Sequence, residues 1–454
     1  MISPTLEDIV SLTKRRGFIF AGSEIYGGLS GTWDYGPLGV SLKRKIESLW
    51  WEFFVERQDE IYGIDSTILM NPKVWQASGH VGTFNDPLIE DKKNKKRYRL
   101  DHVLEDSGID CTGLGLDEMV ELIQKNNIKT PDGNDFGNAG NFNLMFKTFV
   151  GSLENESSIA YLRPETAQGM FVNYKNIIDT FYPDLPFGLA QIGRNFRNEI
   201  APRDFIFRSR EFEIMEFEYF VYPNNWEKEF DKLLKLQIKW YCEVLGLDAK
   251  KLHQKEIKPE DRAHYSKRTI DFEYQYPFGL KEIGGFAYRT DFDLKNHQQF
   301  SGKSMEYLVK GTNERFIPHV LEPTFGLDRC VLAILCEAYR QDTVNSETRT
   351  FLKLDKKLAP YLISVSPLLK NKTELYSKAR DIYELVRSQV PNVNWDDNGN
   401  IGKRYRRQDE IGTPYCVTID FDTIQDGSVT IRNRDTTTQE RIKIDQIIDY
   451  VNKD

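Results

Sequence analysis

The sequence has few cysteines and histidines, and this limits the metal chemistry that it can support. There are five cysteines and six histidines in 454 residues. The cysteines are scattered and form no CxxC pair: Cys111, Cys242, Cys330, Cys336 and Cys416. Scattered thiols fit a reducing compartment and give no support to a disulfide framework or a four-thiolate zinc site. We therefore expect no structural zinc.

Long hydrophobic runs are also missing. No stretch approaches the roughly 18 apolar residues that a membrane span requires. The first ten residues, MISPTLEDIV, include Glu7 and Asp8 and lack the apolar core of a secretory signal. They also lack the Arg-rich and Ser-rich, acid-poor composition of a transit peptide. These absences predict a cytoplasmic protein with no membrane partner.

The chain has no overall excess of positive charge. Its 61 basic and 69 acidic side chains give a net charge of −8, whereas proteins that coat nucleic acids tend to be basic. Any contact with nucleic acid must therefore be local. Two basic runs are candidates, DKKNKKRYR at residues 91–99 and KRYRR at residues 403–407, although each could equally be a solvated surface.

The length allows two or three domains, and hydrophobic periodicity suggests where they lie. After Pro37, apolar residues recur every three or four positions and predict an amphipathic helix. The segments at about 81–160 and 223–285 look like insertions, because their patterns loosen into charge runs and turns. After Leu354, strands and helices alternate over about 100 residues, as in a separate α/β module.

An arginine-rich hairpin at residues 193–220 is the most specific local feature. Apolar, strand-like stretches flank a polar loop, and on a strand Arg197 and Glu199 would project from the same face. More arginines crowd the loop: Arg203, Arg208 and Arg210. They could pair with nearby glutamates, or they could bind a triphosphate, because arginine forks grip phosphate oxygens in pairs. Phe212 offers an aromatic face for a nucleobase.

The segment EPTFGLDR at residues 322–329 predicts a strand, a turn at Gly326 and an apolar helix. Arg329 falls in the first turn of that helix, where a cation opposes the helix dipole unless an anion binds. A surface arginine on a core helix is the alternative. The chain has no GxxxxGK[ST] motif and no GxGxxG between a strand and a helix, so any nucleotide site must be of another kind.

Together these motifs resemble those of class II aminoacyl-tRNA synthetases. FRNE (196–199) with REF (210–212) resembles motif 2, FGLDR (325–329) motif 3, and the helix after GPLGV (36–40) motif 1. The ordered set WDYGPLG, FNLMFKT, YLRPETAQG, GRNFRNE, YRTDFDL and EPTFGLDR is similar to glycyl-tRNA synthetases of the homodimeric type. GKRYRRQDEIGTPY (402–415) resembles the signature of their anticodon-binding domain.

The resemblance implies an α+β fold and a two-domain organisation. Residues 1–354 would form the catalytic domain, an antiparallel sheet flanked by helices, and residues 355–454 an α/β anticodon-binding domain. The implied reaction activates glycine with ATP to glycyl-adenylate and transfers glycine to the 3′ end of tRNA-Gly. In this family the motif 1 helix builds the dimer interface, and a bulky row is expected to do so here: Leu42, Ile46, Leu49, Trp50 and Phe53.

The resemblance also implies roles for individual residues. The ATP-binding set is Arg197, Asn198, Glu199, Phe207, Arg208, Arg210, Glu211, Phe212, Glu282, Ile283, Gly326 and Arg329, of which Arg197 and Arg329 are catalytic. The glycine-binding set is Arg99, Glu165, Phe212, Glu216, Arg289, Glu322 and Thr324. Mg²⁺ would accompany ATP, with Glu282 and Glu322 as its protein ligands. The anticodon set is Lys403, Arg404, Arg406 and Arg407, beside the rings of Tyr405 and Tyr415.

The sequence departs from the family pattern at two places, and two alternative functions remain open. TPDGNDFGNAGN (130–141) stands where many relatives have a cysteine-containing turn, which again argues against zinc, and Thr324 stands where a serine is common. One alternative is a non-catalytic, nucleic-acid-binding accessory subunit, which should lack nucleotide-binding side chains that are present here: Arg197, Glu199, Phe212 and Arg329. The other is a synthetase for another amino acid, against which RPETAQG and EPTFG both argue.

Overall fold

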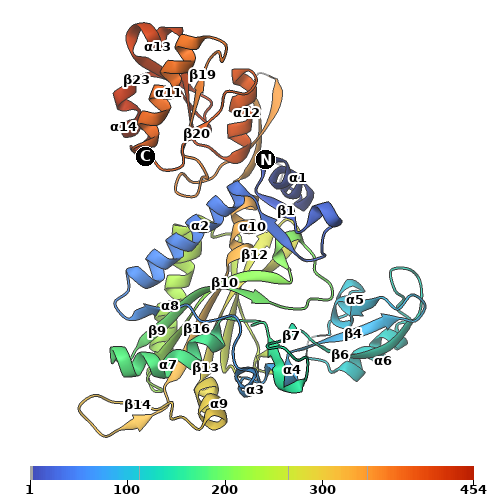
Figure 1. Cartoon of the computed structure of the whole chain (residues 1–454). Helices are drawn as coiled ribbons and strands as arrows, with labels where there is room; N and C mark the ends of the chain where they lie inside the picture. The colour runs from blue at the N-terminus through green and yellow to red at the C-terminus, as the bar shows by residue number, and fades with distance from the viewer. Residues whose placement is uncertain (1–3, 112, 264, 345, 454) are drawn as a thin grey trace.

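The computed structural model describes residues 4–111, 113–263, 265–344 and 346–453, which form a large N-terminal part and a smaller C-terminal part (Figure 1). The centre of the large part is a seven-stranded sheet of order β11-β12-β13-β16-β10-β9-β3. All neighbouring strands are antiparallel except β3 and β9. Their bounds are β3 Ile61–Gly63, β9 Phe187–Phe196, β10 Glu211–Val221, β11 Leu252–Glu256, β12 Arg268–Tyr276, β13 Gly279–Thr290 and β16 His319–Gly326. The antiparallel sheet predicted for the catalytic part is thus confirmed.

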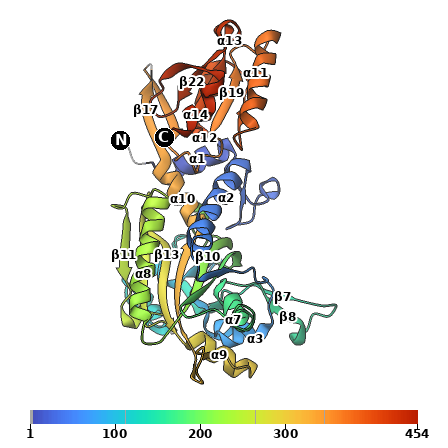
Figure 2. The ribbon, with the colours of Figure 1, turned by 90° about the vertical axis from the view of Figure 1, so that its left-hand side faces the viewer.

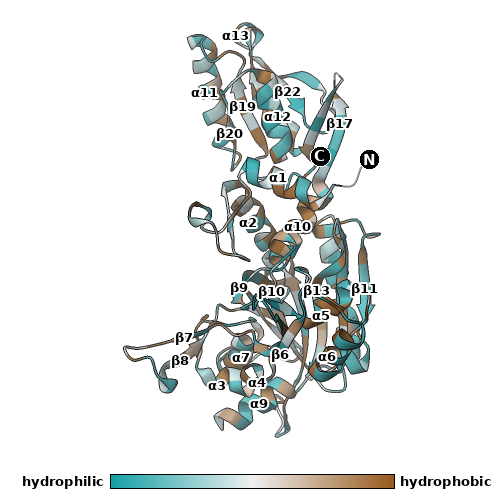
Figure 3. Cartoon of the chain, turned by 90° about the vertical axis from the view of Figure 1, so that its right-hand side faces the viewer, coloured by the Kyte–Doolittle hydropathy of each residue, from teal (hydrophilic) through white to brown (hydrophobic). Residues whose placement is uncertain are grey.

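Three helices pack against this sheet and close the main core: α2 (Pro37–Trp51), α8 (Trp226–Lys239) and α10 (Leu327–Ala338). A π-helical turn prolongs α2 (Glu52–Glu56) and another prolongs α8 (Trp240–Val244). Helix α10 is strongly hydrophobic, as its brown colour shows (Figure 3), and it lies buried between the sheet and α2. Aromatic rings fill the space between α2 and the sheet, with Trp50 packed against Phe217 and Phe325.

The apolar row on α2 has a different role from the one expected. Leu42, Ile46 and Trp50 are each 0% exposed within the single chain, because they pack into its own core. A side chain already buried in one protomer has no surface to offer to a second one. The prediction of a dimer interface is therefore wrong for these three residues, whereas it stays a prediction for Leu49 and Phe53, which are partly exposed.

Smaller elements surround the sheet at both ends. Next to α2 lie α1 (Leu6–Arg16), β1 (Ile19–Ala21) and β2 (Trp33–Tyr35). At the opposite end lie α3 (Pro72–Ala77), α4 (His80–Thr83), α7 (Ala167–Phe181), α9 (Phe292–Ser301), β7 (Lys147–Phe149), β8 (Ile159–Tyr161), β14 (Tyr307–Leu308) and β15 (Arg315–Phe316). Short 3-10 turns complete the large part: Glu24–Tyr26, Glu156–Ser158, Phe205–Phe207 and Pro259–Asp261.

The two expected insertions differ in kind. The first contains a separate three-stranded sheet and two helices with a small core of their own: β4 (Asn85–Asp91), β5 (Arg97–Arg99), α5 (Leu100–Asp106), α6 (Leu116–Lys125) and β6 (Phe136–Asn143). The second, 223–285, is not an insertion in this sense. It supplies β11, β12 and half of β13 to the central sheet, together with the helix α8 that lies beside the sheet (Figure 2).

The C-terminal part is a five-stranded sheet of order β20-β19-β21-β22-β23 with its own core. Its elements are β19 (Ile363–Pro367), α11 (Thr373–Arg387), β20 (Asn394–Trp395), α12 (Ile401–Ile411), β21 (Tyr415–Ile419), α13 (Phe421–Asp426), β22 (Ser428–Asn433), β23 (Gln439–Lys443), a 3-10 turn (Ile444–Gln446) and α14 (Ile447–Asn452). The α/β fold predicted for this part is confirmed. Leu358 and Ala359 still belong to the main core, so the cores divide a few residues after the boundary expected at Leu354.

A hairpin bridges the two parts. It comprises β17 (Tyr339–Val344) and β18 (Glu347–Leu352), and β18 packs against α12. Within the described ranges, no helix is both long enough and apolar enough to cross a membrane.

Candidate active site

A cavity of about 230 Å³ lies where the β9–β10 hairpin, the middle of β13 and the start of α10 meet. Several predicted nucleotide-binding residues line it: Arg197, Glu199, Phe207, Arg208, Phe212, Glu282, Gly326 and Arg329. Thr324, from the predicted glycine set, lines it too. The hairpin and the strand-turn-helix unit, which are far apart in sequence, therefore meet at one cavity.

Two arginines of this cavity, Arg197 and Arg208, are not neutralised by a neighbouring carboxylate. Within the part of the chain that the structure describes, neither Arg197 nor Arg208 forms an ion pair with a carboxylate. The Arg197 guanidinium lies 5.2 Å from the Phe212 ring centre, and its Nε donates to the Pro164 carbonyl (3.2 Å). The salt-bridge interpretation of the hairpin therefore fails for these two arginines, and their charge is available to an anion.

The surroundings of Arg208 disfavour its positive charge. Burial lowers the pKa of Arg208, and neighbouring arginines add to this effect. Burial, with Arg99 nearby, also lowers the pKa of His102 to about 3. The neutral His102 ring therefore accepts a hydrogen bond from Arg208 Nη1 through Nε2 (2.9 Å). A bound polyanion would offset the cost of burying this cationic group.

Arg329 stands on the opposite wall of the cavity. Its guanidinium lies 4.6 Å from the Phe207 ring centre, and its Nη1 is 3.1 Å from the Glu282 carboxylate. Gly326 leaves room beside it, because a Cβ there would lie 3.0 Å from Arg329 Cδ and would press on this side chain. Glycine at the strand-helix turn thus lets this arginine lie along the cavity wall.

Some predicted nucleotide residues take other positions. Arg210 binds backbone, donating to the carbonyls of Glu199 (3.0 Å) and Ser30 (2.6 Å). Glu211 is exposed and pairs with Arg194, and Ile283 is fully buried. The Asn198 backbone N–H donates to Leu144. Strand β9 ends at Phe196, so Arg197 and Glu199 lie beyond the strand, and their shared cavity follows from the turn rather than from strand alternation.

A second set of predicted residues, Glu165, Glu216, Arg289 and Glu322, forms a cluster of charged side chains next to the cavity, which we call the acidic pocket. Glu216 accepts hydrogen bonds from Thr324 Oγ1 (2.9 Å) and from Thr166. Glu322 accepts from Arg289 Nη1 (2.7 Å), and Arg289 also binds Asp293 through two nitrogens (2.8 and 2.9 Å). Because Thr324 lines the cavity and also binds Glu216, the acidic pocket and the arginine-lined cavity adjoin.

Burial is the largest single influence on the pKa values of the carboxyl groups in this pocket. Burial, with Glu216 and Glu165 nearby, raises the pKa of Glu322 to about 8, although Arg289 opposes the shift. Burial and Glu165 likewise raise the pKa of Glu216. Burial alone would raise the pKa of Glu165 as well, but His80, 3.2 Å away, and Arg289 hold it below its ordinary value. A pocket with this many acids and one arginine is suited to a cation.

One residue of the predicted glycine set, Arg99, lies apart from the acidic pocket. Arg99 pairs with Asp86 (2.7 Å) and Asp101 and lies 3.9 Å from Glu199, at the nucleotide end of the site.

The two predicted Mg²⁺ ligands, Glu282 and Glu322, occupy different places along the sheet. Glu322 pairs across the sheet with Ala287, five residues along β13 from Glu282. At about 3.3 Å per residue this places the backbone positions of the two residues roughly 16 Å apart along the strand. Glu282 and Glu322 thus belong to different ends of the site, and their assignment as Mg²⁺ ligands stays a prediction.

The structure adds residues that the sequence analysis missed. Gln168 Nε2 links Glu165 to Asp293 (3.0 Å to each), and Arg163 holds the Arg194 and Ser66 carbonyls. Asp328 accepts from the Glu213 backbone N–H (2.7 Å). Glu218 is fully buried two residues after Glu216. Of these, Glu218 could have been found from the sequence, because strand residues two apart share a face.

The predicted anticodon residues do not all reach the surface. Arg404 is 2% exposed, and its guanidinium donates to the carbonyls of Pro367, Asp397 (3.1 Å) and Gly399 (2.7 Å). Tyr415 is 5% exposed, so neither it nor Arg404 can contact RNA in this conformation. Arg406 and Arg407 are partly exposed and pair with Glu347 and Asp396, whereas Lys403 is exposed.

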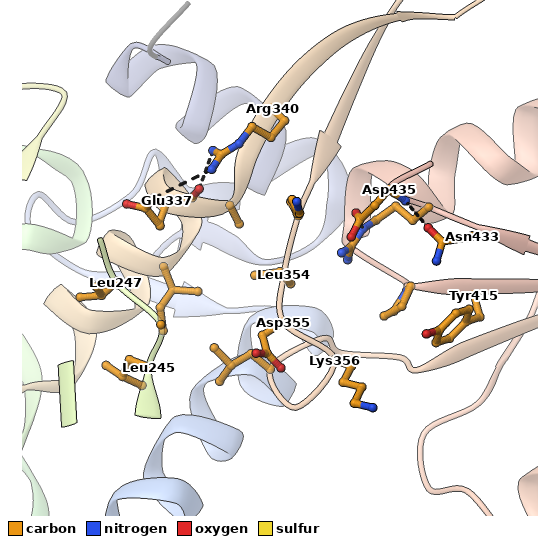
Figure 4. A pocket seen from close by; sticks show the side chains of 17 residues that line it. Leu245, Leu247, Glu337, Arg340, Leu354, Asp355, Lys356, Tyr415, Asn433 and Asp435 are labelled. Carbon is orange, nitrogen blue, oxygen red and sulfur yellow. Dashed lines mark hydrogen bonds and ion pairs between the residues drawn. The ribbon is translucent and has the colours of Figure 1, made fainter. Parts of the chain in front are cut away.

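A larger cavity, of about 560 Å³, lies between the two parts of the chain. Leu245, Leu247 and Glu337 line it from one side, and Tyr415, Asn433 and Asp435 from the other (Figure 4). None of the predicted ATP-binding or glycine-binding residues lines it. The arginine-lined cavity and its acidic pocket thus remain the candidate active site.

Comparison with known families agrees with this geometry. Residues 149–339 match the tRNA synthetase class II core domain (G, H, P, S and T), and residues 363–454 match the anticodon binding domain. The fold and site thus define a class II aminoacyl-tRNA synthetase, and the α+β fold that the resemblance implied is confirmed.

The closer relationship extends over the whole chain. The chain is 48% identical to a glycine–tRNA ligase of Geobacillus thermodenitrificans (strain NG80-2), across 100% of this chain and 98% of the relative. It is 47% identical to that of Mycoplasmopsis synoviae (strain 53), across 98% of each chain. It is 45% identical to that of Bacillus anthracis, across 99% of each chain. The chain belongs to the glycine–tRNA ligase family.

Proposed function

We propose that this chain joins glycine and ATP to form glycyl-adenylate and then transfers the glycyl group to the 3′ end of tRNA-Gly. The observation that carries the proposal is the junction of the two pockets at Thr324. A cavity with arginines that lack carboxylate partners suits a triphosphate, and the acidic pocket beside it suits an ammonium group. The two ends of an amino-acid activation reaction thus lie next to each other.

The first step needs positioning and charge stabilisation rather than proton transfer. A glycine carboxylate oxygen attacks the α-phosphorus of ATP, the bond to the β-phosphate bridging oxygen breaks, and pyrophosphate leaves with its electron pair. Arg197 binds the α-phosphate, and Arg208 and Arg329 bind the outer phosphates. No general base is required, because the nucleophile is already ionised.

The adenine ring lies between aromatic and cationic faces. Phe212 stacks on one face of the ring and Arg329 covers the other. Glu199 is 7% exposed, and its Oε2 has no hydrogen-bond partner within the described residues. A buried carboxylate oxygen of this kind suits a donor on the ligand, and we assign it to the adenine amino group.

Glycine lies with its ammonium group in the acidic pocket and its carboxylate toward Arg197. Glu216 and Glu322 accept hydrogen bonds from the ammonium, and Glu165, whose two oxygens already bind Gln168 and His80, adds its negative charge nearby. Thr324 and Arg289 hold Glu216 and Glu322 in place. Glycine has no side chain to grip, so selectivity comes from steric exclusion of a Cβ atom.

The class II core uses ATP together with Mg²⁺, and Glu282 fits this ion. Mg²⁺ is commonly held by one or two carboxylates plus substrate phosphates, and Glu282 presents an accessible carboxylate on the cavity wall beside Arg329. When bound there, the ion neutralises phosphate charge. Glu322, in the acidic pocket, lies at the other end of the site.

The C-terminal part binds the tRNA anticodon through α12. Its basic, accessible side chains are Lys403, Arg406 and Arg407. A net charge of −8 gives no general attraction to RNA, so this local surface supplies the electrostatic contribution. Residues 1–360 carry the chemistry, and residues 361–454 contribute to the selection of tRNA.

We further propose a two-fold homodimer. Exposed apolar residues gather in front of α2, on the loop between β1 and β2 and on the first turn of the helix: Ile25 (87% exposed), Tyr26 (87%), Leu29 (60%) and Val40 (44%). Leu29 and Val40 line the same surface hollow. These residues, and not the buried row on α2, are the candidates for the interface.

Charging of tRNA tests the proposed function. Purified protein incubated with ATP, Mg²⁺, radiolabelled glycine and tRNA-Gly is expected to form acid-precipitable glycyl-tRNA, and omission of ATP should abolish the product. Tight binding of tRNA without charging would instead favour the accessory-subunit alternative.

A further inference from the structure

Glu218 is a buried carboxyl group that none of the roles above uses. On β10, Glu216 lies opposite Thr324 of β16 and Tyr219 lies opposite Leu321. The same antiparallel register places Glu218 opposite Glu322. The Glu218 side chain is 0% exposed, and neither of its oxygens has a hydrogen-bond partner among the described residues.

Such an arrangement is unfavourable in the free protein. Acidic side chains directly opposite each other on neighbouring strands repel, and buried carboxyl groups are normally hydrogen-bonded or paired. Burial and the nearby Glu322 raise the pKa of Glu218 well above its ordinary value, while Arg289, already bound to Glu322 and Asp293, opposes this only in part. A buried polar group without a partner calls for an explanation, and a functional role is one of the few that apply beside an active site.

The spacing of the acids indicates which ligand this is. One oxygen from each of Glu216, Glu218 and Glu322 lies within 4.8 Å of the others. A primary ammonium group that donates three tetrahedral hydrogen bonds of about 2.8 Å would hold its acceptors about 4.6 Å apart. The three carboxyl groups thus match the three N–H bonds of an ammonium.

We propose that Glu218 is the third acceptor of the ammonium site and binds the α-ammonium group of glycine together with Glu216 and Glu322. This inference rests on the function proposed above and adds a specificity-determining residue to it. With three acceptors, every N–H of the ammonium is satisfied in a buried place, so Glu218 contributes directly to glycine affinity.

The test compares Glu218→Gln with the wild type in glycine-dependent ATP–pyrophosphate exchange. Glutamine keeps the size of the side chain but cannot ionise to give a negatively charged acceptor. The expected result is a KM for glycine raised about tenfold to a hundredfold, as for loss of one charge-assisted hydrogen bond, with the KM for ATP changed less than about twofold. The matched control is Glu229→Gln, a buried glutamate on α8 that accepts from Asn225 (3.1 Å), for which both KM values should stay within about twofold.

Three results would separate the explanations. An unchanged KM for glycine in a folded Glu218→Gln variant would overturn the inference. A shift in the Mg²⁺ dependence in place of the glycine KM would mean that the three acids bind a divalent cation, and would overturn it as well. Absence of glycine-dependent exchange in the wild type would instead count against the proposed function itself.

A second variant keeps the inference testable if Glu218→Gln does not fold, as judged by thermal unfolding. Glu218→Asp retains the carboxyl group but withdraws it by one methylene. It should also raise the KM for glycine while leaving the KM for ATP unchanged, and an unaltered glycine KM would again contradict the assignment.

Discussion

Single residues in this site carry charges that their protein neighbours do not neutralise. Arg197 and Arg208 have no carboxylate partner in the described part of the chain, while the acidic pocket holds more carboxyl groups than cations. Unpaired cations and a group of buried carboxyls are both costly in the free protein and useful where a ligand supplies the complement. A zwitterionic substrate beside a polyanionic one supplies both.

Removing either arginine should abolish most adenylate formation while leaving the fold intact. Loss of one cationic clamp in a closed site costs about 3 kcal/mol, or roughly two to three decades in rate. We therefore expect Arg197→Ala and Arg329→Ala to lower kcat/KM for pyrophosphate exchange by about that factor. Arg57→Ala, which removes an exposed arginine paired with Glu52, is the control. Rates close to the wild type in either variant would contradict the nucleotide assignment.

The affinity for glycine should depend on pH. Glu322 has its pKa raised to about 8 in the free protein, first by burial, and an ammonium group is bound best by the ionised carboxylate. The KM for glycine is therefore expected to fall as the pH rises from about 6 to 8, with little change in the KM for ATP. Measured exchange kinetics with a flat glycine KM over this range would contradict the prediction.

The same shift affects stability in the opposite direction. Between about pH 4.5 and 8, the folded chain retains a proton on Glu322 that the unfolded chain has lost, so this group contributes less stability as the pH rises.

The resemblance to class II motifs named many of the residues that line the nucleotide cavity, although the sequence pattern placed Arg197 and Glu199 on a strand and not on the turn that they occupy. Burial could not be predicted for Arg404, because a basic run looks the same whether it is solvated or bound to backbone carbonyls. Arg210 illustrates the same point in the hairpin, where it holds backbone instead of lining the cavity.

At the scale of elements, hydrophobic periodicity predicted α2 and the β9–β10 hairpin but not what they contact. The row on α2 is apolar because α10 and the sheet cover it within the same chain. Strands β12 and β13 were mistaken for an insertion, because sheet order depends on pairing between distant segments and leaves no local signal. An amphipathic pattern thus shows that a face is buried without showing by what.

Helix α12 allows a structural arginine to be distinguished from a lysine that is proposed to bind RNA. Arg404→Ala removes the donor to the buried Pro367 carbonyl and to the carbonyls of Asp397 and Gly399, and should lower the stability of the C-terminal part by about 1–3 kcal/mol. Lys403→Ala should change stability by less than about 0.5 kcal/mol while raising the KM for tRNA. Calorimetry and charging kinetics measure the two effects, and the opposite pattern in these variants would refute the assignment.

At the scale of the whole molecule, a buried ion network joins the two parts of the chain. Arg349 of β18 is 1% exposed and lies 3.2 Å from Asp409 of α12, which also binds Arg432 (2.8 and 3.0 Å). Because a buried charge network tolerates little distortion, it ties α12 to the β17–β18 hairpin, which follows directly after α10.

Assembly is also a property of the whole molecule. Sedimentation at micromolar concentration should give a two-fold dimer of the 52.9 kDa chain. Replacing Ile25 and Tyr26 by aspartate should shift the equilibrium toward monomer, because it places charge in an apolar contact. A monomeric wild type, or a double variant with undiminished association, would contradict this placement of the interface.

The central claim is that the joined pockets activate glycine. The most direct measurement is ATP–pyrophosphate exchange by the full-length protein with each of the twenty amino acids in turn, with and without tRNA. The account predicts that glycine alone supports rapid exchange, because the acidic pocket binds the ammonium and the closed pocket excludes a Cβ. Faster exchange with any other amino acid, or none with glycine under either condition, would contradict it.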